Sequence, residues 1–159
     1  MKRYGALIAA IVFVFAGLLI LKAVLNSALT DEEMIKSVIV AIADAAEERR
    51  VRGISQHLSE GFRAEEVNFD RDSAIATMQH AFLVYKSIQV EVKNMSVKKL
   101  NDDTAEATLL ASVFASQSAD TRGEDMMRYL GGGRLLVTLK KIDGKWLVTR
   151  TAAVESTAD

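Results

Sequence analysis

His57 and His80 are the two histidines of this chain, and histidine is the side chain best suited to proton transfer near neutral pH. A catalytic histidine or carboxylate has to face an apolar pocket, where desolvation tunes its pKa. His80 lies two positions from both Met78 and Phe82, about 200° from each on a helix, so it is expected to point away from their apolar stripe. His57 adjoins Leu58 at the end of a predicted helix, where a surface or capping role is expected. Neither histidine is therefore predicted to be catalytic.

The paired acidic residues of the sequence have structural explanations. Asp70 and Asp72 stand where a helix needs an N-terminal cap, and the adjacent pair at positions 102–103 builds a turn. Histidines and carboxylates do not recur at metal-ligand spacing. The glycine run at positions 131–133 precedes a predicted strand, whereas a phosphate-binding loop follows a strand and opens a helix. The sequence therefore predicts no catalytic group, no metal site and no cofactor.

Binding of a ligand in a pocket is an alternative to catalysis. Trp146, Val148 and Arg150 are expected to share one face of a strand. If this face lines a pocket, the guanidinium of Arg150 could hold a carboxylate or anionic head group in its planar fork. An exposed arginine whose stem covers Trp146 is the competing interpretation. The predicted pocket residues are Arg150, Trp146 and Phe114, and space for an apolar ligand is expected from Ala105, Ala107, Ala111 and Ala115.

A long connection between two predicted strands, residues 119–133, has a composition suited to a partner. Long loops in compact domains are usually functional or disordered. Exposed methionine and aromatic side chains beside arginine are typical of interaction surfaces. A strand extension or a short helix covering the core is the alternative. The predicted partner-binding residues are Met126, Met127, Arg128, Tyr129 and Leu130.

Three helices are expected ahead of the strands. Thr30 and Glu33 form a capping box, and apolar residues then recur at three- and four-residue spacing until the helix ends near Gly53. Residues 54–62 are predicted to form a second short helix that Gly61 terminates. The third helix begins at one of the two aspartates that could cap it.

The spacing of the apolar residues changes at Ile88, from about four residues, as in a helix, to two, as in a strand. The first strand is therefore predicted to begin there. The alternation slips by one residue at Asn94, and this slip predicts a bulge that bends the strand. Asp143-Gly144 is the tight turn expected of a hairpin. The remaining strands are predicted over residues 104–116, 134–142 and 146–154.

The first two dozen residues are predicted to be a membrane anchor. Lys2 and Arg3 precede an apolar stretch over residues 4–25 that Lys22 alone interrupts. A helix of this length crosses the roughly 30 Å hydrocarbon core of a bilayer. A cleaved signal peptide is the alternative, but the length of the apolar run and the presence of Asn26 where a small residue is needed disfavour cleavage.

The distribution of charge predicts on which side of the membrane the rest of the chain lies. Positive residues precede the anchor and three acidic residues follow at positions 31–33, so the positive-inside rule predicts a single-pass protein of the inner (cytoplasmic) membrane. Its N-terminus would lie in the cytoplasm and its domain in the periplasm or outside. We divide the chain into an anchor (residues 1–26), one domain (27–155) and a tail (156–159). The net charge of -1, with both signs interspersed, argues against nucleic acid, and cysteine is absent.

The order of the predicted elements resembles the nuclear-transport-factor-2-like (cystatin-like cone) superfamily, and the resemblance covers residues 31–154. It rests on the segment Leu58-Ser59-Glu60-Gly61-Phe62-Arg63, on the bent first strand and on the hairpin Asp143-Gly144-Lys145-Trp146-Leu147-Val148. It implies an α+β domain in which three helices pack on a curved, mainly antiparallel sheet of four or more strands around a pocket.

The resemblance leaves the function open, because members of this superfamily include isomerases, dehydratases, ligand-binding proteins and partner-binding proteins. A subset resembles this chain more closely, since it joins one N-terminal transmembrane helix to the cone, as in the inner-membrane scaffold component of type IV secretion machines and in membrane proteins of lipid-transport operons. The leading hypothesis is a membrane-tethered assembly module that forms homo-oligomers or joins a membrane complex. The alternatives are a pocket for an apolar small molecule or lipid and an isomerase- or dehydratase-like enzyme.

Overall fold

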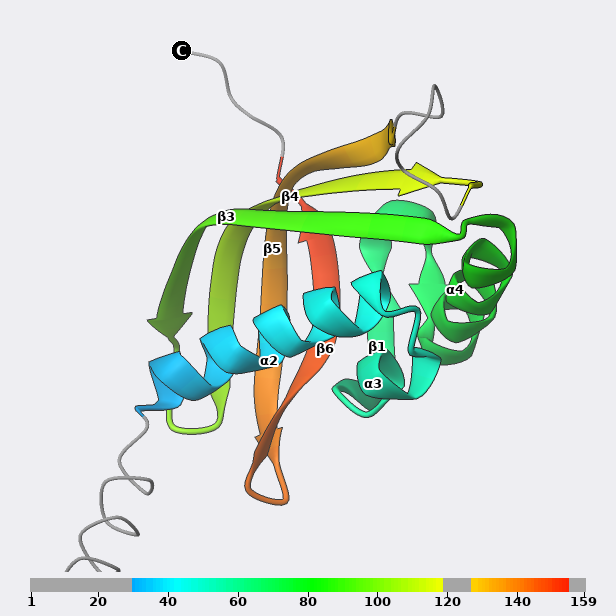
Figure 1. The fold of residues 1–159 in the computed structure, drawn as a ribbon. Helices are drawn as coiled ribbons and strands as arrows, with labels where there is room; N and C mark the ends of the chain where they lie inside the picture. The colour runs from blue at the N-terminus through cyan, green and yellow to red at the C-terminus, as the bar shows by residue number, and fades with distance from the viewer. Residues whose placement is uncertain (1–29, 119–126, 155–159) are drawn as a thin grey trace, which may run out of the picture.

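The computed structural model describes residues 30–118 and 127–154. These residues form an α+β domain in which three helices pack on one curved sheet of six strands (Figure 1). None of the helices in the described ranges has the length and apolar character needed to cross a membrane. The predicted anchor and tail lie outside the described residues.

The first described helix, α2 (Asp31–Glu47), begins as the capping box predicts. The backbone N–H of Glu33 donates to Oγ1 of Thr30 at 3.3 Å, and the N–H of Thr30 donates to the Glu33 carboxylate at 2.9 Å. The helix ends at Glu47, earlier than predicted, because Arg49 adopts a left-handed conformation (φ 54°) that breaks the helical path. A separate short helix, α3 (Val51–Ser55), follows.

The predicted helix over residues 54–62 is wrong, since most of this range is the strand β1 (Leu58–Ala64). Leu58 and Phe62 are both buried, and a spacing of four residues puts two side chains on one side of a helix and also on one side of a strand. Strand pairing decides between helix and strand here, because β1 pairs parallel with β6 and antiparallel with β2. Gly61 therefore lies within a strand and terminates no helix.

A short 3-10 turn, η1 (Glu65–Val67), and the two-residue strand β2 (Phe69–Asp70) lead into α4 (Arg71–Val84). Of the two possible caps, Asp70 caps α4: its carboxylate accepts from the N–H of Ser73 at 2.9 Å. Asp72 lies in the first turn of the helix. No residue of α4 is fully buried, and the helix packs mainly on α3, β1 and β2.

The four long strands are β3 (Ser87–Lys99), β4 (Thr104–Ser116), β5 (Arg128–Ile142) and β6 (Lys145–Ala153), and the order across the sheet is β2-β1-β6-β5-β4-β3. The predicted bulge at Asn94 is confirmed, since its φ is 53° and the register with β4 shifts between Lys93 and Ser96. The predicted hairpin turn at Asp143-Gly144 is also confirmed: both residues have positive φ, and the turn joins β5 to β6.

The strand β5 begins at Arg128, ahead of the predicted start at residue 134, so the glycine run lies inside the strand. A Cβ on Gly132 would stand 2.3 Å from the carbonyl oxygen of Ala111 in β4, which only glycine avoids. The register of β4 and β5 also shifts between Val113 and Phe114. Close approach and a bulge thus occur together where the two strands bend.

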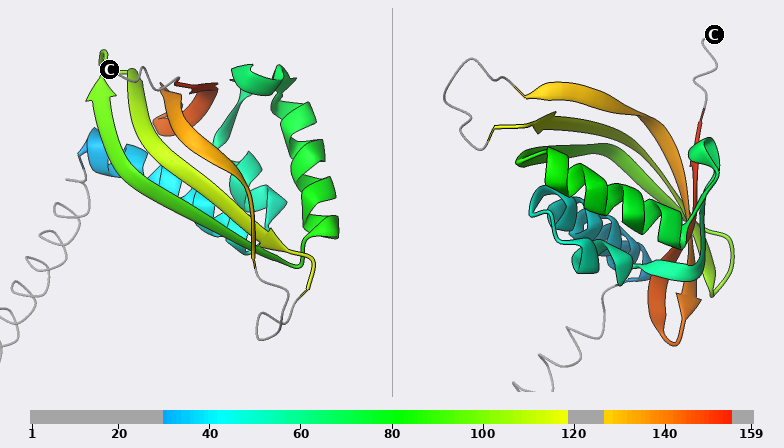
Figure 2. Two further views of the ribbon diagram at one scale, coloured as in Figure 1. Left: turned by 90° about the horizontal axis from the view of Figure 1, so that it is seen from above. Right: turned by 90° about the vertical axis from the view of Figure 1, so that its right-hand side faces the viewer.

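The bent strands curve over the helices, as Figure 2 shows, so that α2 and α4 lie on the concave side of the sheet. The helix α2 crosses the sheet and packs mainly on β3 and on the neighbouring helix α3, with fewer contacts to β6. Its side chains Ile35 and Ile39 are buried. The core beneath α2 also contains Ala105, Ala107, Leu139, Trp146 and Val148.

Candidate ligand cavity

The concave side of the sheet bounds an apolar cavity of about 320 Å³ that opens to the surface. Every element from α2 to β6 except η1 and β2 contributes to its wall, so the whole cone shapes it. Thr151 is the one polar residue among the described lining residues. The lining residues are Ile39, Ile42, Ala43 and Ala46 of α2, Ile54 of α3, Ala74 and Met78 of α4, and, from the strands, Leu58, Phe62, Val90, Val92, Leu109, Ala111, Val113, Leu135, Val137, Val148 and Thr151.

Strand alternation explains which residues of β4 reach the cavity. Leu109, Ala111 and Val113 are two residues apart and therefore face the same side of the sheet. Of the alanines expected to leave space, Ala111 does line the cavity, whereas Ala105 and Ala107 are fully buried in the core beneath α2. Two small side chains on α2, Ala43 and Ala46, line the cavity as well. Small residues on both the helix and the sheet therefore contribute to the space inside the cavity.

The four residues considered for proton transfer all lie outside this cavity. His57 borders a surface groove beside Met34 and Trp146, and partial burial lowers the pKa of its imidazole. His80 is exposed on α4, as is Asp72. The hydrogen bond from Ser73 lowers the pKa of Asp70, which suits its role as a cap. Apart from Thr151, the described residues that line the cavity are apolar.

The prediction that Trp146, Val148 and Arg150 share one face holds for Trp146 and Val148, which are both buried in the core, and is wrong for Arg150. Thr138 of β5 pairs with Arg150 and the next residue, Leu139, pairs with Val148, so one residue of β6 bulges. The bulge reverses the alternation, and Thr151 joins Val148 in the cavity wall. Arg150 instead forms an ion pair with Glu65 at 2.7 Å, and this hydrogen bond raises the pKa of the guanidinium.

The structure also separates the other two predicted pocket residues from the cavity. Trp146 is buried, but it lies near the first residue of α2, and its indole N–H donates to Asp31. Phe114 follows Val113 and therefore faces the opposite side of the sheet, where its ring lies 5.5 Å from that of Tyr129. The alternation of β4 alone could have assigned Phe114 to the outer face, because Leu109, Ala111 and Val113 share the other parity.

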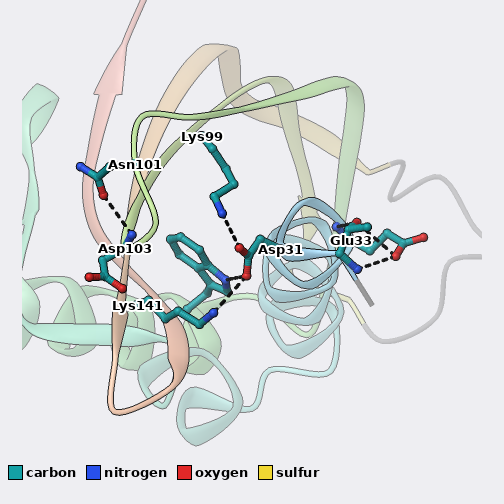
Figure 3. Close-up of polar contacts among 8 residues, drawn as sticks. Asp31, Glu33, Lys99, Asn101, Asp103 and Lys141 are labelled. Atoms are coloured by element: carbon teal, nitrogen blue, oxygen red, sulfur yellow. Dashed lines mark hydrogen bonds and ion pairs between the residues drawn. The ribbon is translucent and has the colours of Figure 1, made fainter. Parts of the chain in front are cut away.

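Asp31 has a structural role that the sequence did not predict (Figure 3). Its carboxylate accepts from Nζ of Lys99 at 2.5 Å, from Nζ of Lys141 at 3.1 Å and from Nε1 of Trp146 at 3.1 Å. The hydrogen bond from Lys99, then those from Trp146 and Lys141, hold the pKa of Asp31 well below its usual value. Asp31 thereby ties the start of α2 to β3, β5 and β6.

The predicted partner-binding loop is in part a strand. Arg128, Tyr129 and Leu130 begin β5, so the strand extension weighed as the alternative is what the structure has for these three residues. Met127 directly precedes the strand, and Met126 lies outside the described residues. Tyr129 and Leu130 are 59% and 46% exposed, which leaves both side chains available on the surface.

Comparison with known proteins gives a fold and no family. No family model matches the chain, and no curated protein matches it. Among solved structures, a nuclear-transport-factor-2-like protein with a cystatin-like fold from Novosphingobium aromaticivorans is 18% identical, with a TM-score of 0.61 over 86% of this chain and 90% of that chain. A proposed scytalone dehydratase from the same organism is 15% identical, with a TM-score of 0.60 over 79% of this chain and 88% of that chain.

Bd1075 of Bdellovibrio bacteriovorus is 16% identical to this chain with a TM-score of 0.60, and the match covers 78% of this chain but only 40% of that protein. Identities this low show the fold alone. The cone architecture that the sequence resembles is therefore confirmed: the chain has the nuclear-transport-factor-2-like, cystatin-like fold.

Proposed function

We propose that the domain binds an apolar small molecule or the apolar part of a lipid in the cavity between α2, α4 and the sheet. The observation that carries this proposal is the hydrocarbon wall around about 320 Å³ of space. Small-molecule sites in proteins have volumes of about 300–1,000 Å³, so this cavity is at the lower end of that range. Apolar cavities half this size stay dry and accept apolar ligands.

An isomerase- or dehydratase-like activity, such as the name of one structural neighbour implies for that neighbour, needs an acid or base beside the substrate. Here His57, His80, Asp70 and Asp72 lie elsewhere in the fold, and the described cavity wall offers hydrocarbon contact. Binding is the function that this wall supports better.

In our proposal the domain works beside a membrane. The predicted membrane segment, residues 4–25, ends a few residues before α2 begins at Asp31. Such a short connection would keep the cavity within a few nanometres of lipid. The proposed location is the inner membrane, with the N-terminus in the cytoplasm and the cone in the periplasm or outside.

The proposal is tested by titrating the full chain, held in zwitterionic lipid nanodiscs, with the uncharged dye Nile red against protein-free nanodiscs as a blank. The wild type is expected to bind the dye saturably. Ala111→Phe fills the cavity and is expected to weaken binding by about tenfold or more, since losing roughly 60 Å² of apolar contact at about 25 cal/mol per Å² corresponds to tenfold.

The matched control is Leu110→Phe, which adds the same ring one residue away on the opposite face of β4. It is expected to leave dye binding unchanged. Unsaturable binding by the wild type, or equal losses in both variants with circular dichroism unchanged, would contradict a ligand cavity.

A second candidate function is an assembly module that self-associates through the outer face of its sheet or joins a membrane complex. The observation that favours it is the aromatic pair of Phe114 and Tyr129 on the outer face, where Tyr129 is exposed. Exposed aromatic side chains are enriched at protein interfaces. Crosslinking of a thiol introduced at Tyr129 tests association through this face.

A further inference from the structure

A second hollow of about 520 Å³ lies at the end of β4, where α4 ends and β5 begins. We call it the vestibule, and its described lining residues are Tyr85, Ala115, Ser116, Gln117, Ser118, Arg128 and Leu130. The backbone N–H of Lys86 donates to the carbonyl of Ser116 at 2.9 Å, which fixes the residue after Tyr85 to the end of β4. In contrast to the cavity, the vestibule has polar and charged walls.

The vestibule lies next to the cavity, because residues of β4 and residues at α4 contribute to the walls of both hollows. On β4, Val113 lines the cavity and Ala115 lines the vestibule, and two residues along a strand are about 7 Å apart on one face. On the α4 side, Met78 lines the cavity, and Tyr85, the residue that caps the C-terminal end of α4, lines the vestibule. The two hollows are therefore successive parts of one concave surface.

Arg128 gives the vestibule its charge. It pairs with Ala115 across β4 and β5, while its neighbour Tyr129 pairs with Phe114 on the outer face, so Arg128 lies on the concave side. It is the one charged residue among the described residues of the vestibule wall. Within residues 30–118 and 127–154 it forms no ion pair.

We propose that this combined site takes a single-chain anionic amphiphile, with its hydrocarbon tail in the cavity and a carboxylate or phosphate head in the vestibule against Arg128. This inference rests on the proposed binding function and adds the class of ligand. The guanidinium presents a planar fork that matches the paired oxygens of such a head group. The cavity wall could not hold the head group itself, because burying a charge among hydrocarbon without a partner is costly.

The test compares three ligands with one tail: dodecanoate, dodecyl phosphate and dodecan-1-ol. Each is isotope-labelled and measured by equilibrium dialysis against the full chain in zwitterionic nanodiscs, with protein-free nanodiscs subtracted. The wild type is expected to prefer the anions over the alcohol by about tenfold, as a hydrogen bond to a charged group implies. The stronger of the two anions shows whether the site favours carboxylate or phosphate.

Arg128→Gln is expected to weaken anion binding about tenfold and to leave alcohol binding unchanged. The control, Arg134→Gln, removes another exposed arginine of β5 that lines neither hollow and is expected to change nothing. If the alcohol binds as well as the anions, or if both arginine variants lose the same affinity, the anionic head group is wrong while the cavity function stands. If none of the three ligands binds saturably, the proposed function itself is wrong.

Discussion

The carboxylate of Asp31 connects the start of α2 to three strands of the sheet. Three donors from three strands converge on it: Lys99 of β3, Lys141 of β5 and Trp146 of β6. Lys141 also lies 5.7 Å from the centre of the Trp146 ring, so the same lysine contacts the indole face and the carboxylate. The ionised form of Asp31 is therefore the form that the folded state favours.

Asp31→Asn is expected to lower the melting temperature at pH 7 and to weaken the dependence of stability on acid. The pKa of Asp31 is lower in the folded state than in the unfolded chain, where it is about 3.9. Its contribution is therefore complete above about pH 4 and is lost as the pH falls through that value toward the folded-state pKa. Thermal unfolding followed by circular dichroism between pH 7 and pH 3 measures both effects.

The control for this prediction is Asp72→Asn, an exposed aspartate that forms no ion pair with any described residue. The wild type and the Asp31 variant should converge in melting temperature as the pH falls. If the melting temperatures of the two proteins fell in parallel with pH, the negative charge of Asp31 would contribute nothing to stability through its three donors.

At the scale of elements, the sequence predicts what alternation and caps determine locally. The capping box of α2, the cap of α4, the bulge in β3 and the β5–β6 hairpin are all confirmed. The errors occur where pairing between distant segments decides. β1 is a strand because β6 pairs with it, and the face of Arg150 is set by a bulge that only the register with β5 reveals.

The candidate site, too, is predicted only where a local pattern in the sequence is sufficient. The sequence predicts a pocket with small residues on β4, and Ala111 lines the cavity. It misplaces three residues for different reasons: a bulge in β6 turns Arg150 to the other face, the alternation of β4 puts Phe114 on the outer face, and Trp146 lies beside Asp31, away from the cavity. The helical and strand residues that line the cavity are distant in sequence, and no local pattern brings them together.

The glycine run of β5 provides a prediction about an element. Gly132→Ala is expected to destabilise the domain by about 1–3 kcal/mol, because its Cβ would stand 2.3 Å from the carbonyl oxygen of Ala111. Gly133→Ala is the matched control, since nothing lies within 4 Å of the position that its Cβ would take. Thermal unfolding of the two variants is the measurement, and equal melting temperatures would show that β4 and β5 separate easily at this point.

At the scale of the whole molecule, one substitution tests both the proposed location and the proposed assembly. The chain contains no cysteine, so Tyr129→Cys introduces a single thiol on the outer face of the sheet. In intact cells this thiol is expected to react with a membrane-impermeant maleimide, as a cone outside the cytoplasm requires. Under oxidation it is expected to form disulfide-linked dimers if two sheets associate by their outer faces.

His80→Cys is the control, because it puts a thiol on the exposed side of α4, away from the outer face of the sheet. It is expected to be labelled equally and to form no dimers. Labelling of either thiol only after cell lysis would contradict the extracytoplasmic location, and equal crosslinking of both would contradict association through the sheet.

The cluster around Asp31 also has a mechanical consequence. Any force transmitted through the chain ahead of Thr30 enters the domain at Asp31, the first residue of α2. There it is divided at once among contacts to β3, β5 and β6, which lie side by side with β4 in one hydrogen-bonded sheet. Contacts that share a force in parallel yield together, whereas contacts in series yield one at a time. A force on the chain ahead of Thr30 would therefore be opposed by three contacts at once before α2 could unwind.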